Sequence, residues 1–189
     1  FIGYPMQMYY GYLTDGVFMN SAEVATWANQ TKVNPSSQAG DIRYKDLNGD
    51  NVVDQKDMTY LGSNIPKFNY SLSLDAGYKG FDIKVLFQGV AKVSGYLSGY
   101  AGWAFNTLGT IQKWQMDGHC DPNNPVRNPA YPRLQAFSNT TPPNYVMSDF
   151  WVLNASYCRI KNLQVGYTVP KSILMKTGIE KVRVYFSGD

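Results

Sequence analysis

The most distinctive residue spacing in the chain lies in an acidic stretch from residue 46 to residue 57. Oxygen-bearing side chains stand at its first, third, fifth, ninth and twelfth positions, which is the ligand spacing of an EF-hand-type calcium loop. Calcium prefers about six to eight hard oxygen ligands, and a tightly coiled loop can direct alternate side chains at one centre. The predicted ligands are Asp46, Asn48, Asp50, the carbonyl of Val52, Asp54 acting through water, and Asp57.

Two positions depart from the calcium-loop pattern. Asn51 stands where glycine is usual, although asparagine tolerates the left-handed backbone region. Asp57 stands where a longer glutamate normally binds with both oxygens. The alternative interpretation is a turn stabilised by Asp and Asn side chains that binds nothing, because these residues favour turns in any context. The sequence leaves both interpretations open.

A second group of candidate residues is aromatic and lies within the segment from residue 90 to residue 151. Trp and Tyr combine a flat apolar face with a polar tip, which suits stacking on sugar rings and contact with protein partners. The alternative is that these rings only pack the segment onto itself. The residues predicted to face a substrate or a partner are Tyr96, Tyr100, Trp103, Trp114, Tyr131 and Trp151.

Catalytic chemistry has no support in the sequence. The single histidine, His119, stands beside Cys120, and the chain has no nucleophile elbow, phosphate-binding loop or dinucleotide fingerprint. Cys120 and Cys158 define neither a disulfide framework nor a zinc site. The net charge of +3, without a basic run, gives no indication of nucleic-acid binding. We therefore predict a protein that is not an enzyme and has no organic cofactor.

The elements that must position these residues are mainly strands. Residues 68–76 alternate apolar and polar side chains, and residues 81–88 return with the same period after a tight turn at Lys79-Gly80. Aromatic residues are abundant (15%) and charged residues are few (16%). Further predicted elements are one or two strands within residues 4–18, strands within 151–169 and 182–186, and short helices at 107–116 and 171–177.

The connections between the predicted strands alternate between short and long. Outer-membrane barrels alternate short periplasmic turns with long extracellular loops in the same way, whereas a soluble antiparallel sandwich is the alternative. A membrane barrel needs at least about eight strands, so this chain cannot close one alone. The predicted fold class is all-β: an antiparallel segment of a large transmembrane β-barrel. The acidic calcium-type loop at 39–66 and the long loop at 90–150 would then be extracellular.

Short motifs in a fixed order along nearly the whole chain resemble one family. The longest is GDIRYKDLNGD at residues 40–50. The others are GYP at 3–5, YGY at 10–12, TDGVF at 14–18, GS at 62–63, PKF at 66–68, YKGFD at 78–82, FQGV at 87–90, YPRL at 131–134, SDFW at 148–151, SYCRIKNL at 156–163, VGYTVPK at 165–171, RVY at 183–185 and SG at 187–188. Together they resemble the C-terminal part of SusC/RagA-type TonB-dependent outer-membrane transporters of Bacteroidetes.

This resemblance implies properties that composition and spacing do not show. Relatives form barrels of about 22 strands in outer-membrane lipid, with an N-terminal plug and a TonB box that would lie upstream of Phe1. They import glycans, or in some members peptides, with a SusD-like lipoprotein as an extracellular lid. The proton-motive force reaches them through TonB, ExbB and ExbD. The expected function is nutrient import in the outer membrane; the alternative is a soluble calcium-stabilised β-rich glycan-binding module.

Overall fold

The computed structural model describes residues 3–106, 109–136, 142–175 and 178–189. The chain divides into two compact units, and each consists of two separate stretches of sequence. One unit holds residues 1–65 and 94–154, and the other holds residues 66–93 and 155–189. Within the described residues, every helix is too short or too polar to cross a membrane.

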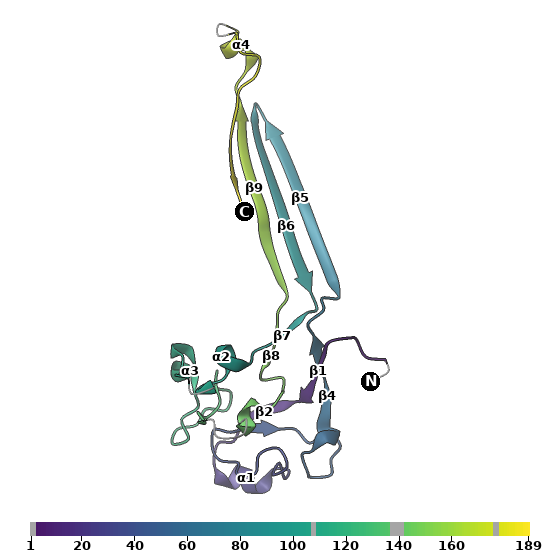
Figure 1. Ribbon diagram of the computed structural model, residues 1–189, viewed down its shortest axis with the longest axis vertical. Helices are drawn as coiled ribbons and strands as arrows, with labels where there is room; N and C mark the ends of the chain where they lie inside the picture. The colour runs from purple at the N-terminus through teal and green to yellow at the C-terminus, as the bar shows by residue number, and fades with distance from the viewer. Residues whose placement is uncertain (1–2, 107–108, 137–141, 176–177) are drawn as a thin grey trace. The chain divides into compact units, whose positions relative to one another are not determined.

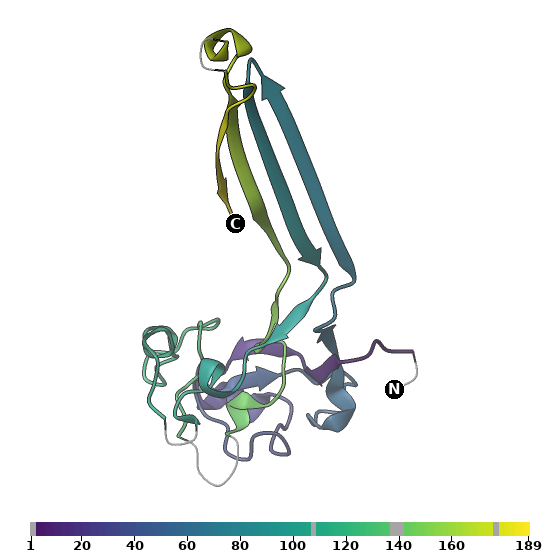
Figure 2. The ribbon, with the colours of Figure 1, turned by 45° about the horizontal axis from the view of Figure 1, so that its top comes forward.

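The second unit is built on one antiparallel sheet of four strands. Its order is β10-β9-β6-β5, from β5 (Phe68–Tyr78), β6 (Phe81–Ala91), β9 (Tyr157–Thr168) and β10 (Arg183–Gly188). These strands lie side by side in both views of the chain (Figures 1 and 2). The short helix α4 (Lys171–Leu174) lies in the connection from β9 to β10.

The turn between β5 and β6 explains why these strands form a hairpin. Tyr78 pairs with Phe81, so only Lys79 and Gly80 connect the two strands. Both residues have positive φ, at 48° and 88°, which is the backbone of a type I′ turn. This turn matches the right-handed twist of the strands that it joins. The predicted hairpin is confirmed, and both strands extend a few residues further than the alternation indicated.

The two faces of this sheet differ sharply in character. Register places Leu72 opposite Phe87 and Leu74 opposite Val85, and these apolar side chains share one face. The other face is mostly polar, apart from Leu86 and Val90, and Lys84 lies 3.2 Å from Asp75 on it. All eleven residues of β5 are exposed, and its large apolar side chains from Phe68 to Leu74 keep 44–55% of their surface accessible within the described residues.

The first unit combines three short two-stranded sheets with short helices. β1 (Met8–Tyr12) pairs with β4 (Met58–Ser63), β2 (Thr14–Val17) with β3 (Ile42–Tyr44), and β7 (Ser94–Tyr96) with β8 (Val152–Asn154). The helices are α1 (Ser21–Thr26), α2 (Gly99–Gly102), α3 (Lys113–Gly118) and the 3-10 turns η1 (Gln55–Asp57) and η3 (Pro143–Tyr145).

Two buried clusters hold this unit together. The first contains Tyr12, Ile42, Tyr44 and Val53, from β1, β3 and the acidic stretch. The second contains Ala104, Tyr131 and Tyr145 from the segment predicted as a long loop, and Trp151 directly after it. The described residues of 94–150 belong with those of 1–65 to one unit around these clusters, and the extracellular position of the long loop stays a prediction.

Several predicted boundaries are wrong. The helix predicted at 107–116 occurs as α3, residues 113–118, and residues 107 and 108 lie outside the described residues. The stretch 151–169, predicted to hold strands, contains β8 and β9, which belong to different units. Regular alternation covers only Leu163 to Thr168, so periodicity does not locate the break between the two strands. The mostly β, antiparallel character is confirmed; the described residues contain no closed barrel, and the transmembrane barrel stays a prediction.

Candidate functional site

The acidic stretch forms a tight loop whose side chains accept hydrogen bonds from its own backbone. The Asp46 carboxylate accepts from the N–H groups of Gly49 and Asn51, each at 2.7 Å. Asn48 accepts from the N–H of Asp50 at 2.8 Å, and Asp50 accepts from the N–H of Val52 at 3.0 Å. Gly49 and Asn51 have φ of 76° and 62°, so the sixth position adopts the left-handed backbone that the calcium-loop pattern expects.

Asp57 closes the loop from within the protein. Its side chain is fully buried and accepts from the N–H groups of Leu47 at 2.8 Å and Asn48 at 3.3 Å. Its other oxygen accepts from the N–H of Asp54 at 2.8 Å, which caps the 3-10 turn η1. These bonds tie the start of the loop to its end.

Asp54 lies at the edge of the same loop and already has a cationic partner. Its carboxylate accepts from the N–H of Lys56 at 2.9 Å and lies 2.9 Å from the Lys32 ammonium. The hydrogen bond from Lys56 and then the contact with Lys32 hold the pKa of Asp54 below its usual value. This carboxylate is therefore ionised at neutral pH.

The donor set suits calcium chemically, because every predicted ligand offers a hard oxygen. However, no group of three or more His, Cys, Asp or Glu side chains converges as a metal site within the described parts of the chain. The oxygens point instead at backbone N–H groups and at Lys32. This geometry matches the alternative of a turn stabilised by Asp and Asn side chains, and calcium binding stays a prediction.

The buried Asp41 connects the stretch before the acidic loop to a distant segment that contains Arg133 and Asn144. Asp41 is fully buried and receives two hydrogen bonds from Arg133, at 2.8 and 3.1 Å, and one from Asn144 at 2.9 Å. Asn144 in turn accepts from the N–H of Ile42 at 2.9 Å. A buried charge needs a partner of this kind, so the pair fixes two segments about a hundred residues apart in one geometry.

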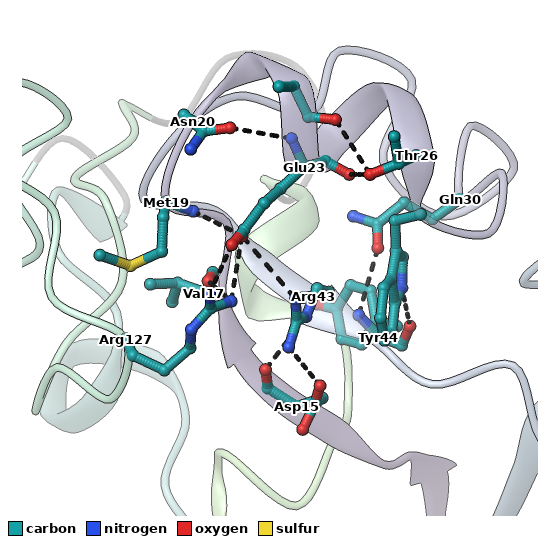
Figure 3. A network of polar contacts seen from close by, with 12 residues as sticks. Asp15, Val17, Met19, Asn20, Glu23, Thr26, Gln30, Arg43, Tyr44 and Arg127 are labelled. Carbon is teal, nitrogen blue, oxygen red and sulfur yellow. Dashed lines mark hydrogen bonds and ion pairs between the residues drawn. The ribbon is translucent and has the colours of Figure 1, made fainter.

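A second polar network anchors helix α1 (Figure 3). Glu23 accepts two hydrogen bonds from Arg127, one of them at 3.0 Å, and one from the N–H of Met19 at 2.9 Å. These contacts, with the Arg127 bond first, lower the pKa of Glu23. Arg43 pairs with Asp15 and lies 3.7 Å from Glu23. The network therefore holds residues of β2, α1, β3 and the distant segment around Arg127 together.

The six aromatic residues predicted to face a substrate or partner divide into three groups. Tyr131 and Trp151 are buried, at 0% and 1% exposed, so their assignment to a binding surface is wrong. Tyr96 and Trp103 pack partly buried against the same cluster. Tyr100 and Trp114 are exposed, at 64% and 40%, and keep rings accessible to a ligand or partner.

The buried rings act as polar as well as apolar packing groups. The hydroxyl of Tyr131 donates to that of Tyr145 at 2.9 Å and accepts from the N–H of Ala104 at 2.8 Å. The Nε1–H of Trp151 donates to the carbonyl of Asn144 at 2.7 Å. Burial raises the pKa of Tyr131 and of Tyr145, so both phenols stay protonated. The two phenols therefore act as hydrogen-bonded packing groups within the buried cluster.

Sequence reasoning missed Asp41, Arg133, Asn144 and Glu23 as organising residues. Asp41 lies within the stretch predicted as an acidic loop, and an aspartate is rarely buried unless it is paired, so the sequence did not indicate its burial. Its partners cannot be found from the sequence either, because they lie about a hundred residues away in a segment without periodicity.

The chain was compared with protein families, with curated proteins and with solved structures. No protein-family model matches the chain. TonB-dependent receptor P3 of Formosa agariphila is 29% identical over 192 residues, covering 98% of the chain and 17% of the receptor. TonB-dependent receptor P26 of the same organism is 27% identical over 178 residues, covering 91% of the chain and 17% of the receptor. The chain thus spans about a sixth of these relatives.

Solved structures agree with this sequence similarity. The RagAB peptide importer in its open-open state has a TM-score of 0.62 with 20% identity, over 98% of this chain and 18% of that one. A second structure, of the RagAB peptide transporter, gives 0.60 with 17% identity over 95% of this chain and 18% of that one. The chain is therefore similar to TonB-dependent receptors in sequence and to RagAB in fold.

The resemblance predicted from ordered motifs is thereby confirmed. The motif at residues 40–50 supplies Asp41, Arg43 and Asp46 to the contacts described above. The motif at 40–50 thus connects distant segments through Asp41 and Arg43, and its last residues form the start of the acidic loop.

Proposed function

We propose that this chain forms barrel wall and extracellular loops of a TonB-dependent outer-membrane transporter. The transporter imports glycans or oligopeptides together with a SusD-like surface lipoprotein, and the proton-motive force reaches it through TonB, ExbB and ExbD. The observation that carries the proposal is the exposed apolar face of the four-stranded sheet, in a chain similar to TonB-dependent receptors.

Strand length supports a membrane-spanning role. β5 and β6 each have 11 residues and β9 has 12, whereas a transmembrane strand needs about 9 to 11 residues at a tilt of about 45°. A soluble protein would have to cover the apolar face, because large exposed apolar patches are rare on soluble monomers. Lipid provides that cover without any further protein element.

The first unit supports a role in extracellular loops. In the chain, this unit connects to the starts of β5 and β9 and to the end of β6. These strand ends lie opposite the two-residue turn, where an outer-membrane barrel has its long connections. Exposed Tyr100 and Trp114 are the side chains from our predicted set that remain available to a lid or substrate. The likeness in fold to the RagAB peptide importer supports oligopeptides, as well as glycans, as substrates.

The test uses the whole gene that encodes this chain. We expect the full-length protein to fractionate with the outer membrane, to run faster on gels when unheated, and to co-purify with a surface lipoprotein. Deleting the gene should abolish growth on one glycan or peptide source, and a copy without its TonB box should not restore it. Recovery of the protein from a soluble fraction, with calcium-dependent glycan binding, would instead support the binding-module alternative.

A further inference from the structure

One end of the four-stranded sheet carries two connections close together. Lys79 and Gly80 join β5 to β6, and residues 169–182 join β9 to β10. The N–H of Thr168 donates to the carbonyl of Gly80 at 2.7 Å, which fixes the two connections beside each other (Figure 2). In an outer-membrane barrel the end with tight turns such as Lys79-Gly80 faces the periplasm, and the longer connection 169–182 lies at the same end.

Positive charge gathers at this turn end. Lys79, Lys171 and Lys181 are exposed, and none has an ion-pair partner among the residues that the structure describes. The nearby acid is Glu180, whereas Arg183 is neutralised by its ion pair with Asp82. The described residues of the turn end therefore carry a net positive charge.

Apolar side chains stand beside these lysines. Ile173, Met175 and Ile179 are 64%, 79% and 50% exposed. The connection also contains a hollow of about 540 Å³, which is far larger than a single ion or water molecule requires. Its lining residues are Lys171, Leu174, Met175, Ile179, Glu180 and Lys181.

Aromatic rings link the turn end to the apolar sheet face. Tyr78 is 72% exposed, and Phe81 packs on Tyr167 with ring centroids 4.5 Å apart. Aromatic rings of this kind concentrate at membrane interfaces, where one side is apolar and the other is wet. Lys79 follows Tyr78 directly, so a lysine adjoins the aromatic rings at this end of the apolar sheet face.

We propose that the turn end is a docking site for an anionic phospholipid of the periplasmic leaflet. Lys171 and Lys181 bind the phosphate, and Ile173, Met175 and Ile179 contact the acyl chains. A free phosphate ion would use the lysines but would leave the adjacent apolar side chains in water, so the arrangement favours a lipid. This inference rests on the proposed function, because it requires the sheet to span a membrane.

The experiment is native mass spectrometry of the full-length protein in detergent, titrated with phosphatidylglycerol or with phosphatidylethanolamine. We compare the parent with the double variant Lys171→Gln/Lys181→Gln, and with a control, Lys56→Gln/Lys113→Gln, that removes two exposed lysines from the other unit. Lysines near an anionic surface contribute about 1 kcal/mol each, or about five-fold. We expect phosphatidylglycerol affinity to fall by about five- to 25-fold in the double variant and to stay at the parent value in the control.

The variant Lys171→Arg/Lys181→Arg should retain parent affinity, because it preserves both charges. The proposal is overturned if the Gln variant binds phosphatidylglycerol like the parent, or if equimolar inorganic phosphate displaces the lipid. The proposed function fails in a different way, by absence of the protein from the outer membrane. A protein that inserts normally without a phosphatidylglycerol preference therefore refutes only the lipid site.

Discussion

Replacing Leu74 by lysine should reveal whether the apolar sheet face contacts lipid. β5 has 11 residues, so at about 3.4 Å per residue it is about 34 Å long. A tilt of about 40° gives a height of about 26 Å, close to the apolar band of about 25 Å in outer-membrane barrels. Leu74 lies next to the middle of this strand, so its side chain is expected near the bilayer midplane. A lysine there costs about 2–4 kcal/mol.

The neighbouring residue supplies a matched control. Ser73 is on the opposite face, where its hydroxyl donates to Asp75 at 3.2 Å, so Ser73→Lys adds the same side chain toward the lumen. The assay is folding of the full-length transporter from urea into phospholipid vesicles, with the folded form resolved as an unheated band on a gel. We expect Leu74→Lys to fold only at lower urea concentrations than the parent, and Ser73→Lys to fold like the parent.

The comparison between the two faces decides the outcome. Equal folding of the two variants would refute the lipid-facing assignment, because lysine would then cost the same on each side of the sheet. Poorer folding of Ser73→Lys than of Leu74→Lys would also refute the assignment. It would indicate that the polar face, and not the apolar face, is the packed one.

Three further predictions concern the first unit of the full-length protein. Asp41→Asn removes a buried charge and should destabilise the loop region by about 3 kcal/mol, measured by thermal proteolysis against the exposed control Asp117→Asn; equal cleavage of the two would contradict the role of the buried pair. Arg127 lowers the folded-state pKa of Glu23, so this contribution is present above the ordinary glutamate pKa of about 4.3 and is lost as pH falls through the lowered pKa. Glu23→Gln should therefore flatten the acid side of a proteolysis–pH profile, and an unchanged profile would count against the pair. Asp50→Ala should abolish calcium uptake in a calorimetric titration if the acidic loop binds metal; uptake that persists would exclude the assigned ligand set.

Local sequence signals predicted the second unit well. Alternation at residues 68–76 and 81–88 specifies two strands, because the side-chain period of a strand is two. Gly80 after Lys79 specifies the turn, because both central residues need positive φ. These features depend on neighbours within a few residues, so they are legible without a structure.

The first unit resisted prediction for the opposite reason. Its buried rings Tyr131 and Tyr145 stand in a segment without periodicity, and Trp151 directly follows that segment. A ring in an irregular segment has the same sequence signature whether it is exposed or buried. Only the packing shows that Tyr100 and Trp114 remain accessible while the others form a core.

The sequence by itself determined the antiparallel hairpin, the two-sided character of its strands, the tight acidic loop and the resemblance to SusC/RagA-type transporters. Tertiary structure decided which strand ends belong to which unit and how Asp41 is neutralised by Arg133. It also decided that the oxygens of the acidic loop point at backbone N–H groups. Backbone turns and periodicity arise from short-range sterics, whereas the burial of a charge or a ring depends on segments that meet only after the chain has folded.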